Sequence, residues 1–96
     1  MAIGERLRLS MAILISSHAL AQSFFRGASE RDITEVLDAG LPIRAKYGRK
    51  GKAKIFHFGG ERLGRFYEDR RVEVFYMQDG GDIIVVTVYV FYGKWE

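Results

Sequence analysis

The spacing of apolar residues changes at Leu41, and this change constrains the fold more than any other feature of the chain. Before it, apolar residues recur every three or four positions, as at Ile33, Val36 and Leu37, which indicates a helix. After it, apolar and polar residues alternate, as in residues 54–58, which indicates strands. We therefore expect an α+β fold with a short N-terminal strand, two helices and then a twisted antiparallel β-meander.

Capping residues mark the ends of the two expected helices. Residues 11–16 are mostly apolar and indicate a short buried strand, after which Ser17 is a suitable N-cap and Gly27 a suitable end for the first helix. The second helix begins after Ser29 and ends at Gly40. In the first helix, the apolar residues at a spacing of four predict the buried face: Leu20, Ala21, Phe24 and Phe25.

Glycines and charged residues divide the second half of the chain into strands. Gly59 and Gly60 both tolerate positive φ and predict a two-residue hairpin turn, and Asp69 with Arg70 predicts another turn. The final strand, residues 83–92, is the longest and is apolar on both faces, so we place it in the middle of the sheet. Simple alternation puts four aliphatic side chains on one of its faces: Ile84, Val86, Val88 and Val90.

Length and composition limit the class of protein. The 96 residues suffice for one domain, which we assign to residues 11–96, with residues 1–10 as an extension. The lack of cysteine excludes disulfides and thiolate ligands, and the two histidines have no ligand-like spacing, so we expect neither a metal nor a cofactor. No apolar run reaches the length of a membrane span, so we expect no membrane partner.

The cellular location has two interpretations. Arg6 and Arg8 precede an apolar stretch, and residues 19–22 resemble a signal-peptidase site, as in a secreted protein. The apolar stretch is short and is interrupted by residues 16–18, which favours a cytoplasmic protein. Met11 is an alternative start of the chain.

A run of cations between Arg44 and Lys54 is the strongest electrostatic feature of a chain whose net charge is +3. Tyr47 interleaves the run, and no acidic residue does. Such a run suits a nucleic-acid backbone, and it equally suits a solvated hairpin whose lysines prevent pairing of strand edges. On the first interpretation, the nucleic-acid-binding residues are Arg44, Lys46, Arg49, Lys50, Lys52 and Lys54.

Several short motifs together resemble a known family. Residues 17–19 (Ser-His-Ala) are followed by residues 26–27 (Arg-Gly), by the capped helix start at residues 29–33 and by the strand at residues 84–89. This order resembles a small prokaryotic family of unknown function that is placed beside the RelE and BrnT toxins, although Ala28 stands where that family often has isoleucine. The resemblance covers nearly the whole chain and implies a RelE-like fold.

The same resemblance implies a toxin-like, metal-independent RNA endonuclease of a toxin–antitoxin system. Its implied partners are RNA, in association with the ribosome, and an antitoxin protein. The chemistry needs groups that remove one proton, deliver another and stabilise charge on the phosphorane. The candidates for these roles are His18, His57 and Arg65.

The two histidines also have structural interpretations. His18 suits proton transfer near neutrality, or it simply caps the start of the first helix. His57 is expected close to Arg62 across the turn at residues 59–60, where the pair would suit a phosphate, or it is an exposed strand residue without a role. Other residues are expected to be structural: Arg70 and Arg71 in a solvated turn, Glu73 as a cross-strand partner of an arginine, and Tyr89 in the core.

Three functions stay open, and they differ in what they predict of the surface. A nuclease predicts a concave face where histidine, arginine and tyrosine side chains converge. A non-catalytic RNA- or protein-binding module on the same fold predicts a basic strip without that convergence. An interaction protein predicts an exposed apolar patch around Phe75 or Trp95.

Overall fold

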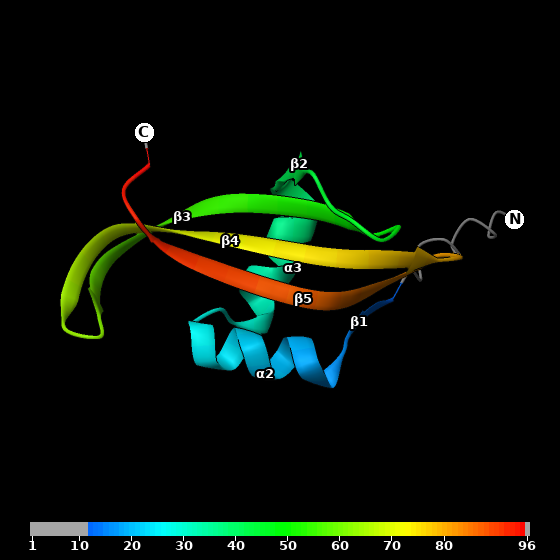
Figure 1. The fold of residues 1–96 in the computed structure, drawn as a ribbon, viewed down its shortest axis with the longest axis horizontal. Coiled ribbons are helices and arrows are strands. Elements are labelled where there is room, and N and C mark those ends of the chain that lie inside the picture. The colour runs from blue at the N-terminus through cyan, green and yellow to red at the C-terminus, as the bar shows by residue number, and fades with distance from the viewer. Residues whose placement is uncertain (1–11, 96) are drawn as a thin grey trace, which may run out of the picture.

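The computed structural model describes residues 12–95 and confirms the α+β class (Figure 1). The remaining residues, 1–11 and 96, lie outside the described part of the chain, and so does the predicted extension at residues 1–10. The described elements follow one another in this order: β1 (Ile13–Ile15), α2 (Ser17–Arg26), α3 (Glu30–Ala39), β2 (Leu41–Ile43), β3 (Lys50–Arg62), β4 (Arg65–Asp79) and β5 (Asp82–Gly93). None of the helices within residues 12–95 is long and apolar enough to cross a membrane.

Within residues 12–95, the five strands form one sheet in the order β1-β5-β4-β3-β2. β1 runs parallel to β5, where Leu14 pairs with Ile84, and the other described pairs are antiparallel. β4 therefore occupies the middle of the sheet, and the prediction of that place for residues 83–92 is wrong by one strand. Among the described strands, β5 has a neighbour on both edges along residues 83–85 alone, so the rest of one edge of β5 needs another cover.

One long hairpin, β3–β4, replaces the two shorter hairpins predicted for this part of the chain. The turn falls at Leu63 and Gly64, which both have positive φ, and the predicted turn at residues 59–60 is wrong. Gly59 instead uses its positive φ in a bulge, where the register of β3 against β4 shifts after His57. The predicted turn at residues 69–70 is also wrong, because both residues pair with β3 within β4.

A second bulge changes which side chains of β5 face the core. Phe75 pairs with Thr87, but the next residue of β4, Tyr76, pairs with Val85, so Val86 is an extra residue on β5. The alternation of side chains reverses at this point. The core-facing residues are consequently Ile83, Val85, Val88 and Val90. The face predicted from simple alternation therefore holds for Val88 and Val90, after the bulge, and is wrong for Ile84 and Val86.

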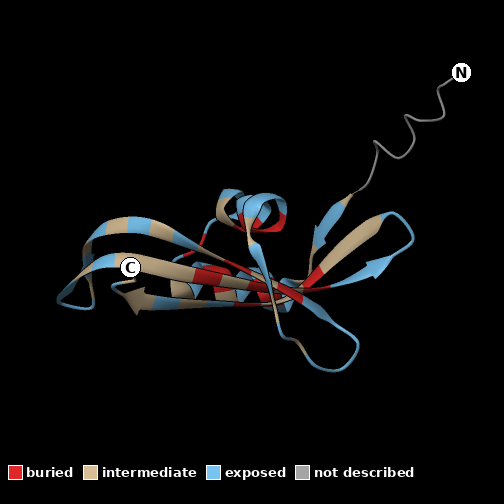
Figure 2. Cartoon of the chain, turned by 90° about the horizontal axis from the view of Figure 1, so that it is seen from above, coloured by how far each residue is buried: buried red, intermediate tan, exposed pale blue. Residues whose placement is uncertain are grey.

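The core lies between the helices and one face of the sheet. α3 crosses that face and packs on β3 and β4, where Val72 and Val74 have no exposed surface. Ile33 and Val36 of α3 are equally buried in the same cluster. Figure 2 shows the buried residues concentrated near the middle of the sheet, while its two ends extend beyond the helices. In the described part of the chain, the opposite face of the sheet carries no helix (Figure 1).

The helix ends form largely as the capping residues predict. In α3, the Ser29 side chain accepts a hydrogen bond from the Asp32 N–H at 3.0 Å, and the Asp32 carboxylate accepts one from the Ser29 N–H at 2.9 Å. The N-cap of α2 is Ser16, one residue before the predicted Ser17. Gly27 ends α2 in the left-handed conformation, with a φ of 91°.

α2 lies along β5 and turns its predicted apolar face outward, so that prediction is wrong. Ala19 and Ser23 are its buried residues, whereas Leu20, Phe24 and Phe25 are exposed. The two buried side chains are small, which allows the helix to approach the strand closely. The apolar periodicity therefore identified a real stripe on the helix and assigned it to the wrong side.

Two polar side chains of α2 explain this orientation. Gln22 Oε1 accepts a hydrogen bond from the Val88 N–H at 3.1 Å, and Arg26 Nη1 donates one to the Val88 carbonyl oxygen at 2.7 Å. These bonds satisfy backbone groups on the edge of β5 that no described strand covers. The polar side of α2 must therefore face β5, and its large apolar side chains point away.

Candidate nucleic-acid interface

The sheet face opposite the helices carries a row of aromatic rings. Phe75 of β4 meets Tyr89 of β5 edge to face, with ring centroids 5.9 Å apart, and Tyr89 stacks on Phe91 at 6.2 Å. Phe75 and Tyr89 project on this face because their chain neighbours Val74 and Val88 point into the core. The expectation that Tyr89 belongs to the core is wrong, since its side chain is exposed.

Gly51 of β3 provides the space for the Phe75 ring. A Cβ atom at position 51 would lie 2.9 Å from Phe75 Cε1 and 3.0 Å from Ile43 Cγ1. Both distances are shorter than the optimal separation of non-bonded carbon atoms, so a larger residue would displace the ring or β2. Gly51 therefore sets the position of Phe75 on the open face.

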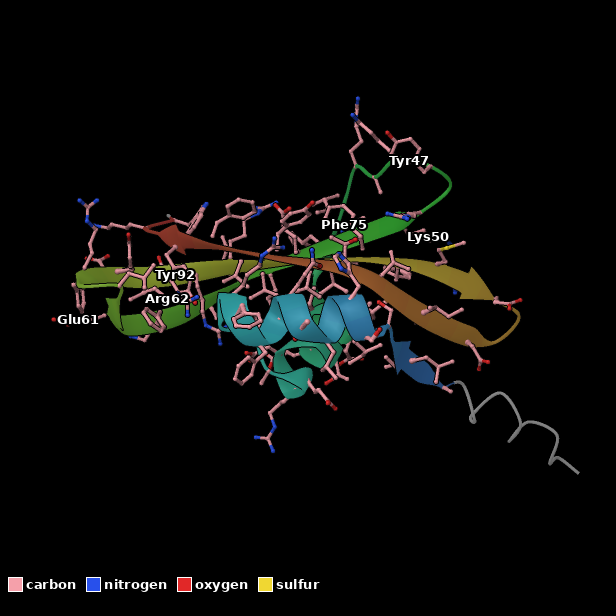
Figure 3. All side chains as sticks on the ribbon, turned by 60° about the horizontal axis from the view of Figure 1, so that its bottom comes forward. Tyr47, Lys50, Glu61, Arg62, Phe75 and Tyr92 are labelled. Atoms are coloured by element: carbon pink, nitrogen blue, oxygen red, sulfur yellow. The ribbon has the colours of Figure 1, made fainter. Side chains whose placement is uncertain are left out.

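The loop between β2 and β3 stands over this end of the aromatic row (Figure 3). Tyr47 and Gly48 have positive φ, and the Arg49 N–H donates to the Lys46 carbonyl oxygen at 3.1 Å, which closes a tight turn. The loop and the sheet together form a hollow of about 250 Å³. We call it the basic hollow, and its lining residues are Arg44, Ala45, Lys46, Tyr47, Arg49, Phe75, Thr87 and Tyr89.

Three of the six predicted nucleic-acid-binding cations line the basic hollow: Arg44, Lys46 and Arg49. The other three do not line it: Lys50, Lys52 and Lys54. The second group alternates onto the helix side of β3. The Lys52 ammonium donates to the Leu37 carbonyl oxygen in the last turns of α3 at 2.6 Å, where the helix dipole favours a cation. The Lys54 ammonium pairs with Glu35 Oε2 at 2.7 Å. Because side chains alternate between the two faces of β3, the run of cations is divided between the helix side of the sheet and the basic hollow.

One further cation, Arg26, reaches the aromatic row from α2. Its guanidinium carbon lies 4.9 Å from the centroid of the Tyr89 ring, within the range of a cation–π contact. The same side chain bonds to the Val88 carbonyl oxygen, so its position is fixed at the edge of β5. This role of Arg26 could not be predicted from the sequence, because the contact joins distant parts of the chain. Its place in the last turn of a helix was the available signal.

Within residues 12–95, the structure places the three predicted catalytic residues apart. His18 is exposed in the first turn of α2, on the helix side of the sheet. His57 is exposed on the open face of β3, with its Nδ1 atom 4.0 Å from Asp69 Oδ1. Arg65 is exposed beside the hairpin turn, where it pairs with Arg62. The expected approach of His57 to Arg62 is wrong, because β3 continues through the glycines that were predicted to turn the chain.

Arg70 and Arg71 lie within β4, and the predicted solvated turn is wrong for both. Arg70 Nη2 lies 3.0 Å from Asp32 Oδ2 and so joins β4 to the start of α3. Arg71 Nε donates to Glu73 Oε2 at 3.0 Å, so the predicted arginine partner of Glu73 is on its own strand and not across the sheet. Since Glu73 pairs with Tyr89 in the β4–β5 ladder, Arg71 forms an ion pair with an acidic group that lies beside the aromatic row.

The basic hollow combines two kinds of group that contact nucleic acids. Its cations can pair with phosphates, and its rings can stack on a base. Within residues 12–95, no group of histidine, aspartate and glutamate side chains is arranged to hold a metal ion. No protein-family model matches the chain, and no curated protein or solved structure matches it either.

Proposed function

We propose that the protein binds single-stranded RNA through the basic hollow without cleaving it. The observation that supports this proposal is the meeting of three cations with two aromatic rings at one place on an open sheet face. The cations come from the loop between β2 and β3, and the two rings come from β4 and β5. Tyr47 of the same loop also lines the hollow.

The chemistry of the basic hollow favours an unpaired strand over a duplex. Stacking on Phe75 or Tyr89 needs a base whose face is free, and a duplex buries the faces of its bases. The volume of about 250 Å³ is small for a drug-sized ligand and suits one nucleotide of a longer chain. Arg44 and Arg49 would hold the phosphates on either side of that nucleotide.

The separation of the three candidate catalytic residues is the reason for proposing binding and not cleavage. Proton removal, proton delivery and charge stabilisation must act on one phosphate, and His18 lies on the other side of the sheet from His57. The endonuclease, its antitoxin and its association with the ribosome stay predictions from the resemblance to RelE-like toxins. That resemblance supports RNA over DNA as the ligand, and the interrupted apolar stretch at residues 11–18 supports a cytoplasmic location.

The test is the salt dependence of RNA binding, measured by fluorescence anisotropy with a short labelled single-stranded RNA. The variant Arg44→Ala/Arg49→Ala removes two cations from the basic hollow. We expect its plot of log affinity against log salt to be shallower by about 0.7 for each cation lost. The control Arg31→Ala/Lys94→Ala removes two cations elsewhere and should keep the wild-type slope.

Two results would contradict the proposal. Equal slopes for the two double variants would mean that the basic hollow does not contact the phosphates. Equal affinity for the same sequence as a duplex would mean that the rings contribute no stacking. Circular dichroism spectra of both variants confirm that the fold is retained, since all four side chains are exposed.

A further inference from the structure

The outward face of α2 is an exposed apolar feature of the described surface that the fold leaves unexplained. Phe24 and Phe25 are 78% and 74% exposed, and Leu20 lies one turn before Phe24. The two rings touch edge to face, with centroids 5.5 Å apart. Contiguous apolar patches of this kind on a single chain commonly mark a surface that binds another protein.

The position of α2 does not depend on these side chains. Its other side supplies the buried Ala19 and Ser23 and the hydrogen bonds from Gln22 and Arg26 to β5. Within residues 12–95, the two phenylalanine rings therefore make no contribution to the core. Both rings are therefore exposed even though α2 is held firmly against β5.

The surface beside the rings is concave and is lined by small residues. A hollow of about 610 Å³ lies between α2 and the start of α3. Phe24 and Phe25 line it together with Leu20, Glu30 and small residues, which are Ser17, Ala21, Ser23, Ala28 and Ser29. A protruding ring therefore stands next to a recess on the same face. This combination is what an isologous interface requires, since each copy must supply both the knob and the recess.

We propose that the Phe24–Phe25 face of α2 binds the same face of a second copy of the chain, which gives a twofold-symmetric dimer. The two rings expose on the order of 300 Å² per chain, given the usual surface of an aromatic side chain. A stable interface buries about 800 Å² per partner. The rings would form its apolar centre, and the walls of the recess would supply the remainder.

The charge of this face favours a second copy over a charged partner. Residues 17–26 contain no acidic residue, and their one arginine, Arg26, is turned toward β5. Among the residues that line the recess, the exposed Glu30 at the start of α3 is the one with an acidic side chain. Two such faces therefore present mainly uncharged surface to each other, with one acidic group in each recess, and they avoid most of the repulsion that the net charge of +3 would cause elsewhere on the surface. The basic hollow lies on the other side of the sheet from α3 (Figure 3), and this dimer does not depend on RNA binding.

The first test is the mass of the protein in solution, measured by sedimentation equilibrium over a range of concentrations. We expect a dimer of twice the 11.0 kDa chain mass for the wild type and a monomer for Phe24→Glu/Phe25→Glu. The control Leu63→Glu/Phe66→Glu changes two exposed apolar residues, 95% and 59% exposed, on the β3–β4 hairpin and should remain a dimer. A wild type that stays monomeric at every concentration would overturn the proposal, and so would equal behaviour of the two double variants.

The second test does not rely on a variant that removes the interface. Because the chain has no cysteine, Ala21→Cys introduces a single thiol at the exposed edge of the recess. Oxidation should give a covalent dimer for Ala21→Cys and leave Leu63→Cys mainly monomeric. Crosslinking of both variants to the same extent would show that the contact is not specific to α2.

Discussion

The Tyr92 hydroxyl donates a hydrogen bond of 2.8 Å to the Arg26 carbonyl oxygen and so joins the last strand to the end of α2. Arg62 of β3 donates to the neighbouring Phe25 carbonyl oxygen at 2.5 Å, and its guanidinium carbon lies 5.0 Å from the Tyr92 ring (Figure 3). The last carbonyl groups of a helix lack partners within the helix, so two side chains from the sheet satisfy them here. The bent part of the β3–β4 hairpin, β5 and α2 thus meet at one point.

Gly27 should be the position in this cluster that is least tolerant of substitution. An added Cβ atom would collide with the Tyr92 hydroxyl and lie 2.8 Å from Arg62 Nη1, and the φ of 91° is unfavourable for any other residue. We expect Gly27→Ala to lower the free energy of unfolding by about 3 kcal/mol, measured by urea denaturation. Gly80→Ala, which has positive φ but open space around it, should lose about 1 kcal/mol. Equal losses in the free energy of unfolding for the two variants would mean that Tyr92 and Arg62 move away from the added Cβ atom without destabilising the fold.

The hydroxyl of Tyr92 should contribute separately from its ring. Tyr92→Phe keeps the ring contacts with Phe58 and Tyr67 and leaves the Arg26 carbonyl group without this donor. The expected loss is about 1 kcal/mol in the free energy of unfolding. Tyr67→Phe, a matched change in the adjacent ring, should have a smaller effect. An unchanged free energy of unfolding for Tyr92→Phe would mean that the bond to α2 does not stabilise the fold.

The hairpin turn offers a substitution that should stabilise the protein. Leu63 has a φ of 54°, which a side chain such as leucine tolerates poorly, and it is fully exposed at the tip. Leu63→Asn creates the Asn-Gly sequence that two-residue hairpin turns prefer. We expect a gain of about 1 kcal/mol, seen as a rise in Tm of about 4–8 °C. Leu63→Ala, which keeps the unfavourable φ, should give no such rise, and a lower Tm for Leu63→Asn would contradict the assignment of the turn.

The fold class and the helix ends were predictable because their signals are local. The capping box of Ser29 and Asp32 and the helix end at Gly27 each depend on a few adjacent residues. The bulges were not predictable in the same way. Glycine tolerates positive φ in a bulge as well as in a turn, so the glycine at position 59 does not indicate which of the two forms. The extra residue Val86 has no local signal at all, yet it reverses the faces of β5.

The candidate site was predictable in part, for a related reason. The run of cations was visible in the sequence, but its division depended on which face of β3 each lysine occupies. The cation–π contact of Arg26 with Tyr89 depends on how α2 lies along β5, which polar contacts with Val88 determine. Apolar periodicity indicates that a helix has an apolar stripe, and it does not indicate that the stripe is covered by the same chain.

The rings of the basic hollow should contribute to RNA affinity independently of the cations. Tyr89→Leu keeps an apolar side chain and removes the stacking surface, so we expect RNA binding to weaken by about 1–3 kcal/mol with little change in its salt dependence. Phe66→Leu, at an exposed ring on the hairpin, should bind as the wild type does. Anisotropy titrations at two salt concentrations separate the two contributions. An unchanged affinity for Tyr89→Leu would remove base stacking from the proposed function.

Binding without cleavage predicts that RNA survives incubation with the protein. RNA incubated with excess protein should run at full length on a denaturing gel, and induced expression in a bacterial host should leave total RNA intact. His18→Ala, His57→Ala and Arg65→Ala should bind RNA as the wild type does, because none of these residues lines the basic hollow. Fragmentation that one of these variants abolishes while keeping its fold would instead establish a nuclease. The separated positions of the three side chains in the described structure would then have to come together when RNA binds.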